Sequence, residues 1–348
     1  MASSRRNLRL TLFLNPEHAA GDSLGRRLAE HQEQVRVARA AGFDGVVIGH
    51  HLSYGSTVWL PPFETLARLT ADAAGMTIGT CMLVLPLLHP VHVAQQAALL
   101  DVLSEGRLVL GVAPGWQPDE FRLVGLDPQQ RFSRFTESVT LIRRLWTEER
   151  VDFAGRHFEV RDASLALRPL RKPRPPLWFG GSTLPAVERA ARLADTAAGD
   201  CWVPSSHLTD DVVTAQATHF RAALAALGKP MPAECPALRN VVVAPDRETA
   251  LRDAGPSLAA SYRVFGRWGL FTNVVGAGKE PLDLPELIAG RVVLGSPEQC
   301  AEELAGLVRT GGFTRLVCRV QWMGMDQRTV LRTIELLAQR VGPLLERP

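Results

Sequence analysis

The chain has 348 residues, of which 46% are hydrophobic and 22% charged, a composition typical of a globular protein whose core needs no disulfide or metal support. Its 39 basic and 36 acidic residues give a formal net charge of +3, which argues against binding to nucleic acid or to an anionic membrane. The five cysteines show no CxxC spacing, and no signal peptide or membrane-spanning apolar run is evident. We therefore expect a cytoplasmic protein without a zinc site or a disulfide framework.

Apolar strand patterns alternate with helical patterns along the chain. The predicted strands cover residues 8–14, 45–48, 76–85, 107–112, 177–179, 196–203, 238–243 and 315–320. The predicted helices cover residues 25–41, 62–74, 89–103, 132–149, 184–194, 209–227, 247–263, 297–309 and 329–341. Strands that are apolar on both faces belong to a parallel sheet covered by helices. Eight such units predict an α/β protein with a closed (β/α)8 TIM barrel, and the lack of GxGxxG after the first strand argues against a Rossmann sheet.

Two irregular segments interrupt this alternation. Residues 150–176 contain a predicted hairpin around Ala154 and Gly155, followed by a loop rich in proline and arginine. Residues 263–291 are rich in glycine, and residues 265–291 of this segment are predicted to form a mobile lid over the site. Because the strand–helix rhythm resumes after each segment, we predict one barrel domain over residues 1–348 with two insertions.

Chemistry in such a barrel is found at the carboxyl ends of the strands. His50 and His51 follow the second strand, and side chains of neighbours in an extended chain point in opposite directions, so one of the two can face the barrel mouth. Cys81 lies in the third strand and is interpreted as an inert buried thiol. His89 and His92 lack a nearby carboxylate partner, so we interpret them as packing at the start of a helix rather than as metal ligands.

Two further loops have the composition of a ligand site. After the fourth strand, Gly115 permits close backbone approach to a planar ligand, and Trp116 can form a pocket wall. After the fifth strand, Gly180-Gly181-Ser182-Thr183 leads directly into a helix, a combination of free N–H groups and positive helix end that suits phosphate.

Several long motifs resemble the bacterial-luciferase-like flavin-dependent oxidoreductases. They are AGFDGVVIGHHL (41–52), IGTCMLVLPLLHPVHVAQQAALLDVLSEGRLVLGVAPGW (78–116), DEFRLVG (119–125), PPLWFGGSTLPAVERAARLAD (175–195) and VVLGSPEQCAEEL (292–304). The resemblance extends over nearly the whole chain in the same order. It implies a (β/α)8 barrel that uses FMN or reduced FMN, or in one branch a deazaflavin coenzyme. It also implies a homodimer.

The resemblance assigns roles to single residues. His51 matches the catalytic or flavin-contacting histidine, but His50 stands where an acidic partner is usual. A non-proline cis peptide behind the flavin maps to Cys81–Met82. Pro114 replaces an arginine near the phosphate, which leaves Arg189 and Arg291 as further candidates beside the glycine-rich loop. The implied cofactor-binding residues are Thr80, Cys81, Met82, Gly115, Trp116, Gly180, Gly181, Ser182 and Thr183.

Three functions follow from the resemblance. The first is a two-component monooxygenase that receives reduced FMN from a separate reductase and uses O2 on a small to medium organic substrate. The apolar segments 54–62 and 268–275 are the expected substrate contacts. The second is hydride transfer with a deazaflavin coenzyme. The third is a flavin-binding protein without catalysis, suggested by His50 at the acidic position.

Overall fold

A computed structural model describes residues 8–53, 57–267 and 283–346. The predicted lid lies partly outside these residues, because 268–282 are not among them, and so do residues 54–56 of the expected substrate contacts. Nine strands form one parallel sheet in the order β10-β9-β6-β5-β3-β1-β13-β11-β12. The sheet strands are β1 (Arg9–Leu14), β3 (Gly45–Ile48), β5 (Thr77–Val84), β6 (Leu108–Ala113), β9 (Leu177–Gly180), β10 (Cys201–Val203), β11 (Pro236–Val243), β12 (Val292–Gly295) and β13 (Arg315–Arg319).

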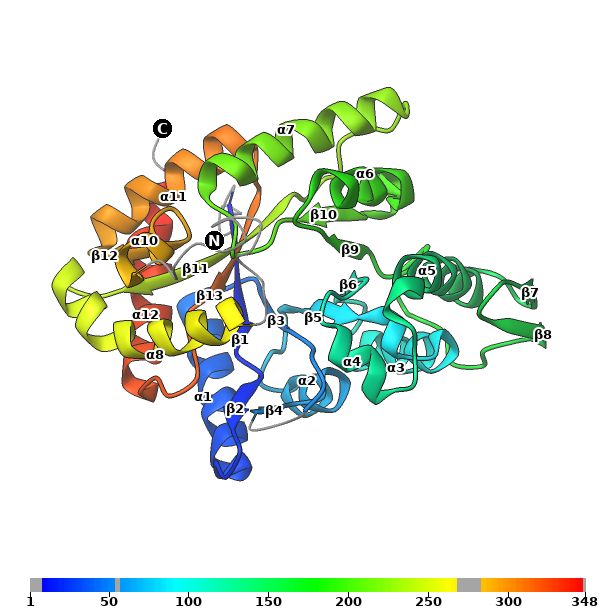
Figure 1. Cartoon of the computed structure of the whole chain (residues 1–348), viewed down its shortest axis with the longest axis horizontal. Coiled ribbons are helices and arrows are strands. Elements are labelled where there is room, and N and C mark those ends of the chain that lie inside the picture. The colour runs from blue at the N-terminus through cyan, green and yellow to red at the C-terminus, as the bar shows by residue number, and fades with distance from the viewer. Residues whose placement is uncertain (1–7, 54–56, 268–282, 347–348) are drawn as a thin grey trace, which may run out of the picture.

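Helices surround the curled sheet, as expected for a TIM-barrel-like fold (Figure 1). They are α1 (Leu24–Ala41), α2 (Pro62–Leu69), α3 (Pro90–Leu103), α4 (Pro118–Leu123), α5 (Arg131–Thr147), α6 (Leu184–Leu193), α7 (Asp210–Ala226), α8 (Arg247–Arg267), α10 (Leu284–Ile288), α11 (Pro297–Gly311), α12 (Gln327–Leu336) and α13 (Gly342–Leu345). Short helical turns cover Leu85–Leu87, Pro128–Gln130, Thr196–Ala198 and Leu337–Val341. Because β10 also contacts β11, the two ends of the sheet approach each other.

Alternation along each strand divides the core into two layers. In β3, Val46 and Ile48 join the large cluster between the sheet and its helices, whereas Val47 points into the barrel. The interior cluster also contains Cys81 and Val317, which come from β5 and β13. This two-sided burial explains why the strands read as continuous apolar runs in the sequence.

Three aspartates join strands at the amino end of the sheet. Asp44 accepts a hydrogen bond from the Leu10 amide (2.9 Å), and Asp101 accepts one from the Leu108 amide (3.3 Å). Asp200 accepts one from the Leu177 amide (2.7 Å) and also binds the Arg174 guanidinium. These carboxylates stabilise the end of the sheet that lies opposite the loops expected to hold the site.

The sequence prediction differs from the structure in its short elements. The sheet contains a ninth strand, β12, whose four residues were not among the predicted strands. The predicted strand 196–203 is shorter, because Thr196–Ala198 forms a helical turn and only Cys201–Val203 pairs with β9. Runs of three or four residues carry too little periodicity to separate strand from loop.

Two small antiparallel sheets lie outside the main sheet. β7 (Val151–Ala154) and β8 (Glu159–Ala163) form the predicted hairpin, which extends beyond α5 at one end of the molecule (Figure 1). β2 (Glu17–Ala19) pairs with β4 (Thr57–Trp59), and the sequence prediction contained neither strand. Because β2 directly follows β1 and β4 follows the histidine loop, this second sheet lies at the carboxyl ends of the barrel strands.

Candidate functional site

His51 is held in place by a carboxylate. Its Nδ1 atom lies 2.9 Å from Oε2 of Glu120, while Oε1 of the same carboxylate accepts a hydrogen bond from the Leu52 amide at 2.7 Å. The Glu120 side chain is fully buried, whereas the His51 side chain keeps 22% of its surface exposed. An ionised carboxylate requires a donor at Nδ1, so the geometry leaves Nε2 of a neutral His51 as the atom that faces the site.

Glu120 was missed in the sequence analysis, although its motif, DEFRLVG, was noted. It belongs to α4, a six-residue helix after β6, and lies 69 residues beyond its partner. The acidic partner that His50 appeared to displace is therefore supplied from another loop. The sequence shows an acidic residue after a barrel strand, which could have identified Glu120 as a candidate. Its contact with His51 joins residues that are distant in the sequence, so no local pattern predicts it.

His50 has a different environment from its neighbour. Its Nδ1 accepts a hydrogen bond from the Val84 amide at 3.2 Å, and the side chain is buried. Burial, with a smaller contribution from the charge of His51, lowers the pKa of His50 to about 4. His50 is therefore a neutral side chain that joins the ends of β3 and β5, as expected for neighbours that point in opposite directions.

Two tryptophans flank His51. The ring of Trp59, in β4, meets the imidazole edge-on with centroids 4.6 Å apart. Trp116, in the loop after β6, lies 6.4 Å away in a similar edge-on arrangement and keeps 37% of its surface exposed. Trp116 therefore lies beside the candidate catalytic histidine, and its role as a pocket wall stays a prediction.

The predicted cis peptide is present between Cys81 and Met82, at the carboxyl end of β5. Burial raises the pKa of the Cys81 thiol to about 12, so this cysteine is no nucleophile. The Thr80 hydroxyl donates to the Gly111 carbonyl at 2.7 Å and is fully buried. Thr80 therefore joins β5 to β6, and direct contact between its side chain and a cofactor stays a prediction.

Glycines let the backbone pack closely around Met82. A Cβ atom at Gly180 would lie 2.7 Å from Met82 Cγ and 3.3 Å from the Ala113 side chain. A Cβ atom at Gly111 would overlap the Thr80 carbonyl and lie 2.9 Å from Met82 Sδ. The glycines therefore let β6 and β9 pack closely against the Met82 side chain, which gives a glycine-lined wall at this position.

The loop from Gly181 to Thr183 reaches the amino end of α6. Thr183 is the N-cap residue, yet its side chain makes no capping hydrogen bond, and both Ser182 and Thr183 are exposed. Gly181 packs against the first turn, where an added Cβ would lie 2.9 Å from the Ala186 side chain. The helix end is therefore uncovered by its own cap, as a phosphate site requires.

Two arginines lie against the ring of Phe132, at the start of α5. The guanidinium of Arg131 is 4.3 Å and that of Arg189, in α6, is 4.2 Å from the Phe132 ring centroid. Burial lowers the pKa of Arg189, and the charges of Arg192 and Arg131 lower it further. Neighbouring cations that repel one another create a positive region beside α6, and sequence reasoning identified Arg189 but not Arg131.

Arg291 does not belong to this positive region. Its guanidinium donates to the carbonyls of His207 (3.0 Å), Glu286, Leu287 and Ala289, and so fastens the segment before β12. These hydrogen bonds to backbone carbonyls give the Arg291 side chain a structural role. The suggestion that Arg291 binds a cofactor phosphate finds no support in this position.

The remaining predicted loop residues have structural roles. Gly115 adopts φ +77°, and an added Cβ would meet the side chains of Val84 and Phe121. His89 caps α3, because its Nδ1 accepts from the Val91 amide at 3.3 Å, as the helix-start interpretation predicted. Cofactor contact by Gly115 stays a prediction.

A second polar pair occupies the ends of β1 and β13. Glu17 Oε2 lies 3.8 Å from an Nη atom of Arg319, and both side chains are at least 90% buried. Sequence reasoning missed both residues, because it inspected the loops after later strands and omitted the loop after the first. Glu17, a charged residue directly after the first predicted strand in Asn15-Pro16-Glu17, could have identified this site in the sequence.

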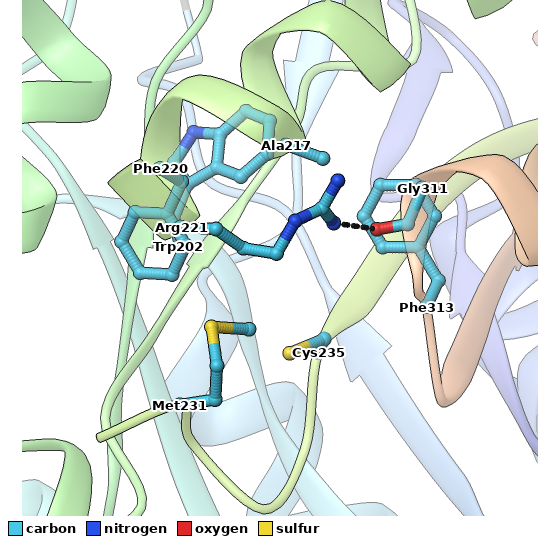
Figure 2. A pocket seen from close by; sticks show the side chains of 8 residues that line it. All are labelled: Trp202, Ala217, Phe220, Arg221, Met231, Cys235, Gly311 and Phe313. Carbon is cyan, nitrogen blue, oxygen red and sulfur yellow. Dashed lines mark hydrogen bonds between the residues drawn. The ribbon is translucent and has the colours of Figure 1, made fainter. Parts of the chain in front are cut away.

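A small pocket outside the barrel lies away from this constellation. Trp202, Phe220, Met231 and Arg221 line it, and Arg221 donates to the Gly311 carbonyl at 2.7 Å (Figure 2). Its lining also includes Cys235, directly before β11, so the pocket opens toward the amino ends of the strands. Among the described residues, no three or more His, Cys, Asp or Glu side chains are grouped so that they could hold a metal ion, and no helix is long and apolar enough to cross a membrane.

Comparison with known proteins identifies the family. A family model described as luciferase-like monooxygenase matches residues 8–315. The chain is 31% identical to 4-hydroxyprotoasukamycin monooxygenase of Streptomyces nodosus subsp. asukaensis, over 95% of this chain and 90% of that protein. It is 25% identical to the oxygenase component of the flavin-dependent trigonelline monooxygenase of Acinetobacter baylyi, over 85% of each chain.

Solved structures support the same fold. Monooxygenase RslO1 of Streptomyces bottropensis superposes with a TM-score of 0.83 at 23% identity, covering 97% of this chain and 99% of that chain. An F420-dependent secondary alcohol dehydrogenase superposes with a TM-score of 0.76 at 18% identity, covering 98% and 99%. At these identities the likeness shows the fold alone. The family match over most of the sequence and the 31% identical relative show that this chain belongs to the luciferase-like monooxygenase family.

Proposed function

We propose that this chain is the oxygenase component of a two-component monooxygenase, which uses reduced FMN and O2 on a small to medium organic substrate. Two curated relatives are monooxygenases, and one of them is named as a flavin-dependent oxygenase component. The observation that carries the proposal is the His51–Glu120 pair beside the glycine-lined wall at Met82. It combines a proton-handling group with a surface suited to a flat ring.

The residues at the barrel mouth fit FMN. The backbone around Met82 and Gly180 would support the ring, and the uncapped α6 end with Arg189 would hold the phosphate. Reduced FMN would supply the electrons that activate O2. No second charge is needed at Pro114, because Arg131 and Arg189 already provide positive charge from the neighbouring helices.

The protein's own residues would control the proton. Glu120 fixes the His51 ring through Nδ1, so Nε2 can accept a proton from a group in the site or return it. Trp59 and Trp116 cover the imidazole edge and limit access by water. The predicted lid 265–291 would complete this exclusion, and its central residues lie outside the described part.

Cofactor titration tests the proposal. The apo protein is mixed anaerobically with reduced FMN and, separately, with the deazaflavin coenzyme, and binding is followed by fluorescence. We expect reduced FMN to bind and, after O2 is admitted, an added organic substrate to be oxygenated without NAD(P)H. Tight deazaflavin binding with no affinity for FMN would reject the monooxygenase.

The second candidate is hydride transfer with a deazaflavin. The F420-dependent dehydrogenase that shares the fold favours keeping this alternative. The third candidate, a flavin-binding protein without catalysis, was suggested by the missing acidic partner at His50. Glu120 supplies that carboxylate, so this reason no longer holds. A separate reductase and a homodimer stay predictions of the family resemblance, and a cytoplasmic location stays a prediction from the cysteine pattern.

A further inference from the structure

The Glu17–Arg319 pair has one buried oxygen without a hydrogen bond. Glu17 Oε2 is buried and has no hydrogen-bond partner among the described residues, since its distance of 3.8 Å from the arginine exceeds hydrogen-bond length. Buried polar atoms in proteins are nearly always paired, so an unpaired one at the mouth of a barrel points to a group that arrives with a ligand.

Two hydrogen bonds and three aromatic rings hold the Arg319 guanidinium in place. Its Nε donates to the Gln321 carbonyl at 3.3 Å, and one Nη donates to Asn15 Oδ1 at 3.2 Å. Three aromatic rings surround the guanidinium, with centroids 5.5–5.9 Å away, in Phe13, Phe265 and Trp322. A preorganised guanidinium among flat apolar side chains suits the oxygen of a ring-shaped ligand.

Glu17 lies at the same end of the barrel as His51. In the small antiparallel sheet, Glu17 pairs in register with Trp59, and directly opposed residues project from the same face. The Trp59 ring contacts His51 at 4.6 Å. Glu17 and His51 therefore both neighbour Trp59, at the same end of the barrel.

The charges at the pair select a ligand that both donates and accepts. A carboxylate would be repelled by ionised Glu17, and an ammonium would be repelled by Arg319. A hydroxyl oxygen can lie about 2.8 Å from both Oε2 and Nη2 when these atoms are 3.8 Å apart. Such a group accepts from the guanidinium and donates its hydrogen to the carboxylate.

Burial raises the pKa of the Glu17 carboxyl, against the opposing effects of the Arg319 and His51 charges. A more basic carboxylate is a stronger hydrogen-bond acceptor and can take a proton from an acidic hydroxyl. Phenols and enols have such a hydroxyl on a flat, unsaturated frame.

We propose that Glu17 and Arg319 recognise the substrate, and that they select a phenol or an enol. Arg319 donates to the oxygen, and Glu17 accepts its hydrogen. When the proton transfers, the O–H bond breaks, its electron pair stays on the oxygen beside Arg319, and Glu17 becomes a neutral carboxylic acid. The inference rests on the proposed function, because it takes the barrel mouth as the substrate chamber.

Fluorinated probes test the pair in the apo protein. Binding of 4-fluorophenol, 4-fluoroanisole, 4-fluorobenzamide and 4-fluorobenzoate is measured by fluorine NMR. We expect 4-fluorophenol to bind at least tenfold more tightly than 4-fluoroanisole, which has no hydrogen to donate. E17L and R319M should abolish this preference, and R328M, at an exposed arginine, should keep it.

Other rankings overturn the proposal. Equal binding of phenol and anisole would remove the need for a donor. Tightest binding of the benzoate would indicate an anion site at Arg319 alone, and tightest binding of the benzamide would indicate another substrate class. Should E17L or R319M fail to fold by circular dichroism, E17Q and R319K, which preserve polarity, replace them with a smaller expected loss of the preference.

FMN titration of the same variants separates this inference from the proposed function. We expect E17L and R319M to bind FMN like the unaltered protein. Loss of FMN binding in these variants alone would assign the pair to the cofactor and reject substrate recognition. Failure of the unaltered protein to bind FMN would instead reject the proposed function. The preference for phenol over anisole is measured in the apo protein, so it is tested independently of FMN binding.

Discussion

His51 and Glu120 are joined at 2.9 Å, although they lie 69 residues apart and belong to loops after different strands. The same carboxylate holds the Leu52 amide through its other oxygen at 2.7 Å. One buried side chain thus fixes both the ring and the backbone of the histidine loop. Replacing Glu120 would therefore change how His51 is held while keeping the imidazole itself.

We expect E120Q to reverse the tautomer of His51. The Gln carbonyl would keep the Leu52 amide, so its NH2 group would donate to Nδ1 and force the ring hydrogen onto Nε2. Nitrogen NMR of the histidine ring measures this change. Turnover of an oxygenated substrate should fall about 10- to 100-fold, the usual cost of removing a supporting carboxylate, with unchanged FMN affinity.

E120A provides the matched comparison. It removes the acceptor for Leu52 as well, so the amide of Leu52 should exchange with solvent faster than in E120Q. Equal exchange in the two variants, or full activity in both, would contradict the role assigned to Glu120.

The parts of the site that the sequence predicted are those set by local pattern. The glycine–hydroxyl loop before α6 and the histidines after β3 follow directly from strand and helix signals, and the resemblance to the luciferase-like family placed the cis peptide at Cys81–Met82. Glu120 and Arg319 were missed because their partners are distant in sequence, and no local pattern encodes such a contact. β12 was missed because four apolar residues read equally well as a strand or as a lead into a helix.

Arg189 is expected to bind the cofactor through its phosphate. R189M should weaken FMN binding about 10- to 100-fold, the effect of one charge-assisted hydrogen bond, and leave riboflavin binding unchanged. Fluorescence quenching of both flavins measures this difference. R192M is the control on the same helix, because its side chain is 60% exposed and pairs only loosely with Glu188. Equal weakening of FMN and riboflavin would show a general disturbance of α6 instead.

Gly111 is expected to tolerate no side chain. In G111A, the new Cβ would overlap the Thr80 carbonyl, a backbone atom that cannot turn away. We expect a loss of about 1–3 kcal/mol in the free energy of unfolding, as for other overpacked cores. In G306A, inside α11, nothing lies within 4 Å of the new atom, so stability should rise by about 0.5–1 kcal/mol. Urea unfolding of both variants tests the contrast, and a neutral G111A would contradict it.

Two buried histidines should make the fold sensitive to acid. His18 and His31 lie with ring centroids 5.4 Å apart, and burial lowers their pKa values to about 4 and about 3. Both values are below the unfolded value of about 6.5, so the unfolded chain binds more protons as the pH falls from about 6.5 toward 4. The free energy of unfolding is therefore unaffected by the protonation of these two histidines above this pH window, and it falls as the pH decreases through the window. At pH 5 the loss should be about 2 kcal/mol for each histidine.

Replacing one histidine isolates this effect. Urea unfolding at pH 7.5 and pH 5.0 should show that H31Q loses about 2 kcal/mol less between the two pH values than the unaltered protein. The comparison uses the change with pH, so a general loss of stability from the substitution cancels. An identical change with pH in both proteins would mean that His31 becomes protonated in the folded state at pH 5, in conflict with its burial beside His18.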